Sequence, residues 1–471
     1  MTPFTLSRRA VQNGCLGRGQ FHPTCPGGFS TPFGATACHL TSDAGLHQTA
    51  DKNLGSSRSL FRRFHIPHLR SFSQHHRLKG VTSVGRMATE TKTLTAQCFC
   101  KSVHFTITVP VSLLPLATHL CNCFICRQVH GTLACFHAAL RSDITPQFIA
   151  PSSLTTSVTR YRHADAASDR LFCKTCGCHI GDEDITPDHA SGALEWRVAT
   201  SIFAGPLDDS IFQIRSHLFT SPASSSAGLH TWLPTIDTRA LATYNFHPSP
   251  SGTPHPIFPI PAPEPPKQEF SPPSSSSPEH ERLRAECHCG GVSFTLPRPS
   301  HPSLASNPLV KRYTSPVDPN KWVACLDVCN DCRLLTGAHV TAWTFVPLTA
   351  LEPPVPSTFT GFGTLTSYRS SEGVLRGFCG CCGATVFYSS EEADERVQGD
   401  TRIVDVAVGI LRAPEGIAAE KWLTWRTGRL AFYESGKAFD RGFTEGLARG
   451  MRQWGEREHG EVLEFDIPLL M

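Results

Sequence analysis

The sequence has no long apolar run and no strong excess of charge. No stretch approaches the roughly 18 apolar residues of a transmembrane helix, and the N-terminus lacks the apolar core of a secretory signal. The net charge is +3 over 471 residues, so the basic surface of a dedicated nucleic-acid-binding protein is missing too. We therefore expect a soluble intracellular protein, cytoplasmic in the first place, whose partner is a small molecule. Its oligomeric state is not predicted.

Acidic residues are almost missing from the first 86 positions, where Asp43 and Asp51 are the only carboxylates before Glu90. Such a composition suits a mitochondrial presequence, but Pro and Gly interrupt the segment and it has no sustained amphipathic period. Residues 1–90 are expected to be a disordered or targeting extension, with a mitochondrial location as the alternative. Translation starting at Met87 is a further alternative.

Cysteine, by contrast, is abundant, and its pattern occurs twice. Both copies contain a CxC motif, then a middle motif ending in CxxC, and then a final CxxC. The cysteines are Cys98, Cys100, Cys121, Cys123, Cys126, Cys173 and Cys176 in the first copy and Cys287, Cys289, Cys329, Cys332, Cys379 and Cys382 in the second. Closely spaced pairs in a chain without a secretory signal favour thiolate metal ligation over disulfides. We interpret the pattern as two copies of one zinc-binding domain.

The rest of the chain divides around these copies. Residues 241–284 are rich in Pro and Ser and are predicted to be a linker between a domain at 91–240 and a domain at 285–440, with a helical tail at 441–471. Alternating segments such as Val103–Val109 predict short strands, and one helix is expected at about Phe443–Gly455. The fold class is therefore mainly β, with two tandem zinc-binding antiparallel β domains. The second copy is 17 residues longer between its first two motifs, which predicts a surface loop at 298–321.

The CxC and the final CxxC of each copy supply four thiolates, the number that closes a tetrahedral structural zinc site. A metal that joins sequence-distant pairs also closes a long loop, which stabilises the fold. The predicted structural ligands are Cys98, Cys100, Cys173 and Cys176, then Cys287, Cys289, Cys379 and Cys382.

The middle motif of the first copy offers three thiolates, Cys121, Cys123 and Cys126. Three protein ligands leave one tetrahedral position open for a thiol or water, as in catalytic zinc sites. The alternative is a second structural site, in which His119 or Cys135 is the fourth ligand. The sequence supports the open site and the closed site equally.

The middle motif of the second copy differs, because Asp327 stands where the first copy has Cys121. A mixed Asp327, Cys329 and Cys332 site is predicted, with Cys325 as a possible substitute for the aspartate and loss of this metal as the alternative.

The order CxC, CxCxxC-Arg and Phe-CxxC-Gly resembles the glutathione-dependent formaldehyde-activating enzyme family, also called the CENP-V/GFA domain. The resemblance implies a β fold with two zinc ions per domain, one of them structural and one at which glutathione is a cosubstrate. The implied activity is that of a carbon–sulfur lyase on a glutathione adduct of formaldehyde or another small carbonyl. Lys101 stands where the family has glycine and Asp327 replaces a ligand, so catalysis is better supported in the first copy.

Further residues are candidates around the first middle motif. Arg127, like Arg333 in the second copy, is a candidate partner for a glutathione carboxylate, with a solvated surface role as the alternative. His119 and His130 are candidate proton carriers, and no catalytic residue is assigned beyond the metal ligands. A noncatalytic, zinc-stabilised interaction module remains the alternative function.

Overall fold

The computed structural model describes residues 90–164, 166–186, 194–220, 227–245, 280–390 and 402–468, which all belong to one compact unit, Val84–Met471. The predicted N-terminal extension, apart from its last residue, and most of the predicted linker lie outside these described residues. Among the described residues, no helix is long and apolar enough to cross a membrane.

The first repeat, which runs from 91 to 244, is built mainly of short strands. A hairpin of two strands pairs with a third in one sheet, and eight strands form a second sheet in the order β13-β10-β3-β4-β9-β8-β7-β6. The elements are β1 (Thr91–Gln97), β2 (His104–Pro110), β3 (Leu116–Cys121), α1 (Phe124–His130), β4 (Cys135–Ala139), β5 (Gln147–Phe148), α2 (Leu154–Ser157), β6 (Val158–Tyr161), β7 (Ser168–Cys173), β8 (His179–Asp184), β9 (Trp196–Ala199), β10 (Phe212–Leu218), α3 (Leu229–Trp232), β11 (Thr235–Ile236), β12 (Arg239–Ala240) and β13 (Ala242–Tyr244).

The second repeat, from 282 to 425, repeats this plan. Its hairpin is followed by a sheet in the order β18-β19-β20-β21-β17-β16-β22. The elements, with the two helices that follow the repeat, are β14 (Arg282–Glu286), β15 (Ser293–Pro297), α4 (Pro308–Lys311), β16 (Trp322–Asp327), α5 (Asn330–Thr336), β17 (Thr341–Pro347), β18 (Leu365–Ser371), β19 (Val374–Cys379), β20 (Thr385–Ser390), β21 (Ile403–Ala407), β22 (Leu423–Trp425), α7 (Tyr433–Phe439) and α8 (Arg441–His459).

Apart from β13, the strands of the two main sheets follow the same order, which confirms the prediction of a mainly β fold in two sheet-rich regions. Most strand pairs are antiparallel, as expected. The exceptions are β10, which pairs in parallel with β3 and β13, and β22, which pairs in parallel with β16. A strand that returns to the sheet after a long connection is not bound to the antiparallel direction that a tight hairpin imposes.

The repeats contact each other through equivalent surfaces. The backbone N–H of Phe99, in the first CxC, donates to the carbonyl of Leu334, and the N–H of His288, in the second CxC, donates to that of Gln128. Leu334 and Gln128 occupy the same position of α5 and α1, one residue after the motif arginine. The same reciprocity appears in side chains, where Tyr161 hydrogen-bonds the His288 ring at 2.7 Å. This is the pattern of an isologous dimer interface, here formed within one chain.

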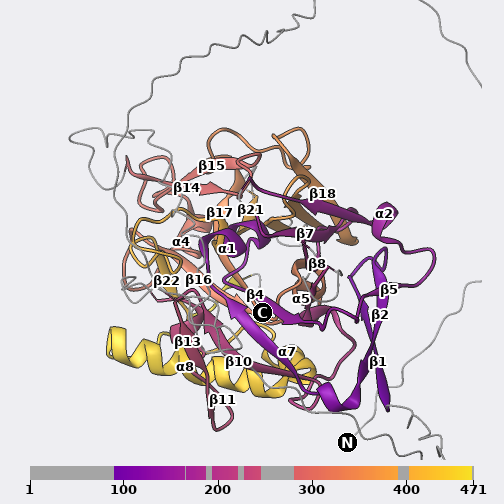
Figure 1. Ribbon diagram of the computed structural model, residues 1–471. Helices are drawn as coiled ribbons and strands as arrows, with labels where there is room; N and C mark the ends of the chain where they lie inside the picture. Colours follow the sequence, from indigo (N-terminus) through magenta and orange to yellow (C-terminus); the bar gives the residue numbers. More distant parts are fainter. Residues whose placement is uncertain are drawn as a thin grey trace, which may run out of the picture. The chain divides into compact units, whose positions relative to one another are not determined.

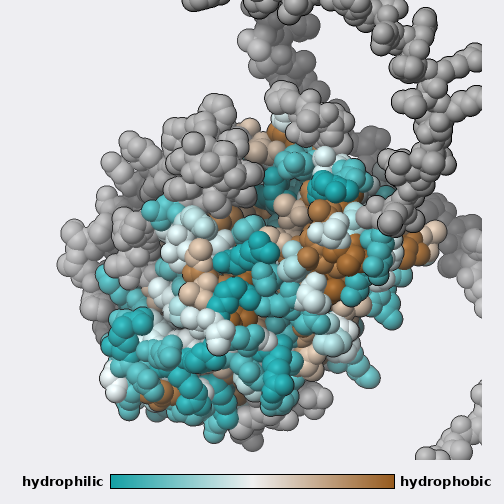
Figure 2. Space-filling model, turned by 60° about the horizontal axis from the view of Figure 1, so that its bottom comes forward, coloured by the Kyte–Doolittle hydropathy of each residue, from teal (hydrophilic) through white to brown (hydrophobic). Residues whose placement is uncertain are grey.

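The core is shared between the repeats as well. One cluster of buried residues contains Leu120 and Phe136 of the first repeat together with Trp343 of the second and Met451 of α8. A second cluster, made mainly of first-repeat residues, includes Leu335 of the second repeat. Because apolar residues of each repeat pack into the core of the other, we expect the two repeats to unfold together. On the face drawn in Figure 2, hydrophobic residues lie in patches that hydrophilic ones divide, so that this face presents no single large apolar surface.

Helix α8 is longer than the predicted helix and packs against α3 and β11 (Figure 1). It buries Phe443, Leu447, Met451 and Trp454, whose spacing of four, four and three residues follows one helical face. Gly450 is needed here because a Cβ would lie 2.0 Å from the carbonyl oxygen of Trp232. The sequence prediction was too short because the glycines lower helix propensity, whereas packing against the first repeat decides the outcome.

The insertion at 298–321 is more than the surface loop that was expected. It contains α4, which Asn307 caps, and it buries Leu304, Val310 and Tyr313. Tyr313 stacks on Phe345 of β17 with ring centroids 5.6 Å apart. The prediction of a surface loop was wrong because apolar residues of the insertion pack onto the second sheet.

Candidate metal centres

Four side-chain groups in the described residues could hold a metal ion, two in each repeat. The first type, which we call the hairpin clusters, joins the CxC after the hairpin with the final CxxC. Each consists of four cysteines with sulfur atoms within 4.8 Å of one another: Cys98, Cys100, Cys173 and Cys176, then Cys287, Cys289, Cys379 and Cys382. The structure therefore brings together the residues predicted for the structural sites, in buried positions suited to a closed site.

A turn at each CxC aims both sulfurs at one point. In the first repeat Lys101 adopts φ 62° and its N–H donates to the Cys98 carbonyl at 3.0 Å; in the second, Gly290 adopts φ 73° and makes the equivalent bond. The left-handed conformation explains why glycine is favoured there. Hydrogen bonds from neighbouring thiols, Cys173 first, lower the pKa of Cys100 well below its usual value, which favours the thiolate that binds metals.

The second type, which we call the helix clusters, lies where a strand ends and a short helix begins. In the first repeat Cys121 ends β3, and Cys123 caps α1 with its sulfur, which accepts from the Cys126 N–H at 3.3 Å. The carboxyl end of the helix is set by Gly131 in a left-handed conformation. A strand end, a cap and the first helical turn thus place three cysteines within six residues of chain.

A fourth cysteine joins the first helix cluster. The sulfurs of Cys121, Cys126 and Cys135 lie within 4.8 Å of one another. The predicted ligand Cys123 is not part of this group, although it interacts with the thiols of Cys121 and Cys126. Cys135 reaches the cluster because β4 pairs with β3 in a register that sets it directly opposite Cys121. Of the two residues considered for completing this site, Cys135 is present, whereas the His119 ring hydrogen-bonds Ser216 at 2.8 Å.

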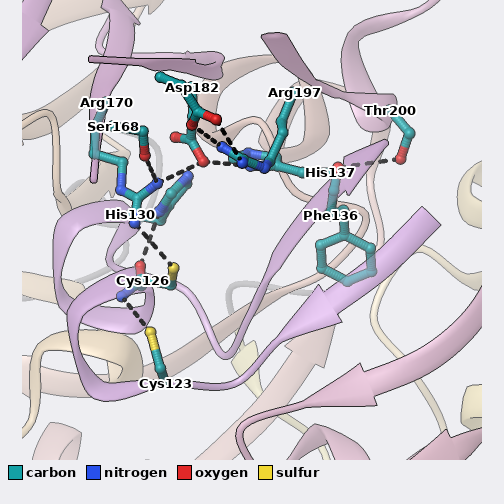
Figure 3. Close-up of polar contacts among 11 residues, drawn as sticks. Cys123, Cys126, His130, Phe136, His137, Ser168, Arg170, Asp182, Arg197 and Thr200 are labelled. Atoms are coloured by element: carbon teal, nitrogen blue, oxygen red, sulfur yellow. Dashed lines mark hydrogen bonds and ion pairs between the residues drawn. The ribbon is translucent and has the colours of Figure 1, made fainter. Parts of the chain in front are cut away.

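A charged network supports the first helix cluster (Figure 3). Arg170 of β7 points its Nη2 at the Cys126 sulfur, 3.7 Å away, and pairs with Asp182 at 2.5 Å, which also binds the His137 ring at 3.1 Å. Thiol hydrogen bonds, from Cys121 first, together with the charge of Arg170 lower the pKa of Cys126. Burial alone opposes ionisation of Asp182, but the charges of Arg170 and His137 outweigh it and hold its pKa below the usual range.

Three histidines fill the space behind this network. The His130 ring lies 3.9 Å from that of His179 and 5.4 Å from that of His137, measured between centroids. His130 donates through Nδ1 to the Cys126 carbonyl at 2.8 Å, while its Nε2 is buried without a hydrogen-bond partner. Burial lowers the pKa of His130 to about 4, so the ring is neutral at pH 7.

The second helix cluster has the same backbone but different donors. Asp327 ends β16, Cys329 caps α5, and Cys332 follows, with their ligand atoms within 4.8 Å of one another. One carboxylate oxygen of Asp327 accepts from the Cys329 N–H at 2.7 Å and the other accepts from the Cys332 thiol at 3.4 Å. Cys325 is buried in the core instead of joining the group.

The second helix cluster also has an arginine on its last sulfur. Arg376 of β19 donates through Nη1 to Cys332 at 3.5 Å, and its guanidinium lies 4.3 Å above the Tyr388 ring. Tyr388 stands opposite Arg376 as Asp182 stands opposite Arg170. Asp405 interacts electrostatically with Arg376, and burial raises the pKa of Asp405 well above its usual value.

The other sequence candidates have structural partners. Arg127 donates through Nε to the Asn122 carbonyl at 3.1 Å, and the contact with a glutathione carboxylate stays a prediction. Arg333 is buried between the repeats, where it bonds the Ser201 carbonyl and lies 3.6 Å above the Phe439 ring. Its burial favours a role in the interface between the repeats.

The sequence offered Cys135 only as one of two residues that could complete the first middle motif, and it did not reveal Arg170 or Arg376 as parts of these sites. Cys135 stands outside every CxC or CxxC pair, and the two arginines lie in strands far along the chain. The one signal was their repetition, because each arginine precedes the next motif cysteine by three residues in both copies.

One comparison with known proteins gives a match. The sequence model of a family described as glutathione-dependent formaldehyde-activating enzyme matches residues 93–220 and 310–425, more than half of the chain. The first match contains a complete hairpin cluster and helix cluster, and the second begins within the insertion that follows the second hairpin. No curated protein matches the chain.

Proposed function

Because the chain belongs to the glutathione-dependent formaldehyde-activating enzyme family, we propose that it is a zinc-dependent carbon–sulfur lyase. Its substrate is the adduct of glutathione with a small carbonyl such as formaldehyde. In the synthetic direction the thiol sulfur attacks the carbonyl carbon, a C–S bond forms, and the C=O electron pair moves to oxygen, which takes up a proton. The thiol loses one proton in the same reaction, so that atoms and charge balance, and cleavage is the reverse.

The donor sets suit zinc. Zinc takes four tetrahedral ligands and favours thiolate, imidazole and carboxylate, which is the chemistry of all four groups. We assign the hairpin clusters to structural zinc, and the helix clusters to a second zinc in each repeat. The residues of a helix cluster would hold the ion, which would supply the positive charge that lowers the pKa of an incoming thiol.

The observation that carries this proposal is the arginine on the last sulfur of each helix cluster. Arg170 lies 3.7 Å from the Cys126 sulfur and Arg376 lies 3.5 Å from that of Cys332. Such a cation offsets the negative charge of the gathered thiolates, and at an open site it also stabilises an alkoxide that forms there. Both repeats have this arginine, although its cross-strand partner is Asp182 in the first repeat and Tyr388 in the second.

The proposal predicts that the full chain accelerates exchange between glutathione, formaldehyde and their adduct, measured by NMR exchange spectroscopy. Replacing Cys126 and Cys332 together by serine should remove the acceleration. Cys381→Ser, which changes an exposed thiol outside the four groups, is the matched control and should keep it. A wild-type chain with full metal content and no acceleration would refute the lyase and leave the interaction module as the function.

A further inference from the structure

The two helix clusters differ at one position that decides how many ligands the protein supplies. In the first repeat Cys135 stands opposite Cys121 and forms a group of three sulfurs with Cys121 and Cys126, and Cys123 interacts with the thiols of the last two. In the second repeat the residue opposite Asp327 is Thr341. The hydroxyl of Thr341 is fully buried and has no hydrogen-bond partner. A buried hydroxyl without a partner is costly, unless a ligand or water supplies one.

A small pocket lies beside Arg376, the residue that contacts the second helix cluster through Cys332. Its cavity volume is about 20 Å³, and Thr336, Trp343, Thr385, Arg376 and, from the first repeat, Cys176 are among the residues that line it. A cavity of this size has room for a molecule little larger than water and is far smaller than the pockets of drug-sized ligands. It therefore suits the small carbonyl of the proposed reaction and not a whole tripeptide.

The same space is filled in the first repeat. The strand registers and helix positions make three pocket residues, Thr336, Trp343 and Thr385, equivalent to His130, His137 and His179. The three histidine rings pack against one another there. The first repeat thus has both its ligand position and its adjoining space occupied by its own side chains.

Arg376 connects the two parts of the second site. It donates to the Cys332 sulfur at 3.5 Å and also lines the pocket. A carbonyl held in the pocket therefore lies next to a buried cation, which stabilises the negative charge that develops on oxygen when sulfur attacks carbon. Asp405, buried and with one carboxyl oxygen unpartnered, interacts electrostatically with Arg376.

We infer that the second repeat takes the substrate thiol, at the position that Cys135 fills in the first repeat, with the carbonyl in the adjoining pocket. The first helix cluster is then a closed four-cysteine structural site. This assignment rests on the proposed function. It places catalysis in the second repeat, whereas the cysteine motifs alone favoured catalysis in the first. The C–S bond forms between the sulfur at the second helix cluster and the carbon in the pocket, and the oxygen takes the proton.

The test is a glutathione titration of the cobalt-substituted full chain, followed by the visible absorption of the metal–thiolate centres. The wild-type chain should show a change that saturates at one equivalent of thiol. Thr341→Cys supplies the missing fourth sulfur and should abolish the change or weaken thiol binding at least tenfold, with the metal content kept. Cys135→Thr opens the first helix cluster and should raise the saturation to two equivalents.

A second variant tests the assignment independently, in case Thr341→Cys does not fold. Thr385→His places in the pocket the residue of the first repeat, and should slow adduct exchange while the thiol-induced absorption change persists. If Thr341→Cys keeps both the absorption change and the exchange activity, the assignment to the second repeat is wrong but the lyase stands. If the wild-type chain carries its metal and shows neither, the proposed function itself fails.

Discussion

Replacing Gly131 by alanine should weaken the contact between the two repeats. Gly131 ends α1 with φ 71°, and a Cβ there would lie 2.1 Å from the carbonyl oxygen of Thr385 in the other repeat. Ordinary contacts begin at 3.4 Å, and the opposing atom belongs to the backbone of β20, which cannot rotate away. Gly460 offers a matched control, since it ends α8 with φ 76° and has nothing within 4 Å of an added Cβ.

The expected loss in the free energy of unfolding has two parts. A left-handed conformation costs a residue with a Cβ about 1–2 kcal/mol, and this part applies to Gly131→Ala and Gly460→Ala alike. Forcing extra volume into a packed contact adds about 1–3 kcal/mol, and this part applies to Gly131→Ala alone. We therefore expect a loss of about 2–5 kcal/mol for Gly131→Ala against about 1–2 kcal/mol for the control.

Urea unfolding of the metal-loaded full chain measures both losses. Gly337→Ala gives an independent repetition, because its Cβ would lie 2.1 Å from the carbonyl oxygen of His179 by the reciprocal contact. Equal losses for Gly131→Ala, Gly337→Ala and Gly460→Ala would show that the repeats do not touch at these points, and would refute the twofold packing.

Lys101→Gly should raise the free energy of unfolding by about 1 kcal/mol in urea, because Lys101 is held at φ 62° where the second repeat has glycine; an unchanged or lower stability would contradict the strained turn. Cys98→Ser should lower the zinc content by one per chain and the melting temperature with it, whereas Cys381→Ser should change neither. Burial lowers the pKa of His217 from 6.5 to about 4. Between about pH 6.5 and 4 the His217 ring is protonated in the unfolded chain but neutral in the native one. The free energy of unfolding therefore falls as the pH drops through this range, by about 1.4 kcal/mol per pH unit for this group. His217→Gln should flatten this part of the pH profile, and an unchanged slope would show that the ring is protonated in the native state.

The cysteine spacing was enough to predict the two hairpin clusters and the mainly β fold. CxC and CxxC pairs encode a local geometry, and alternating apolar residues such as those of β2 and β15 encode strands, so both signals are local. The sequence could name Cys135 only as an alternative to His119 and gave no sign of Thr341, because both residues reach the helix clusters through the pairing of β3 with β4 and of β16 with β17. The shared core and the reciprocal contacts of Phe99 and His288 likewise depend on residues distant in the sequence.

The reciprocal interface explains how one chain can hold two different versions of one site. Gly131 packs against the backbone of Thr385, and Gly337 packs in the same way against that of His179. These close contacts require the same backbone conformation in both repeats, which agrees with the shared strand order of the two sheets. Cys135 and Thr341 stand opposite strand partners of their own repeat, so this requirement does not extend to them. Cysteine at 135 closes one site, and threonine at 341 leaves the other with three ligands and a pocket. The closed repeat then supports the open one through a rigid shared core, which is the arrangement that a small, preorganised thiol site needs.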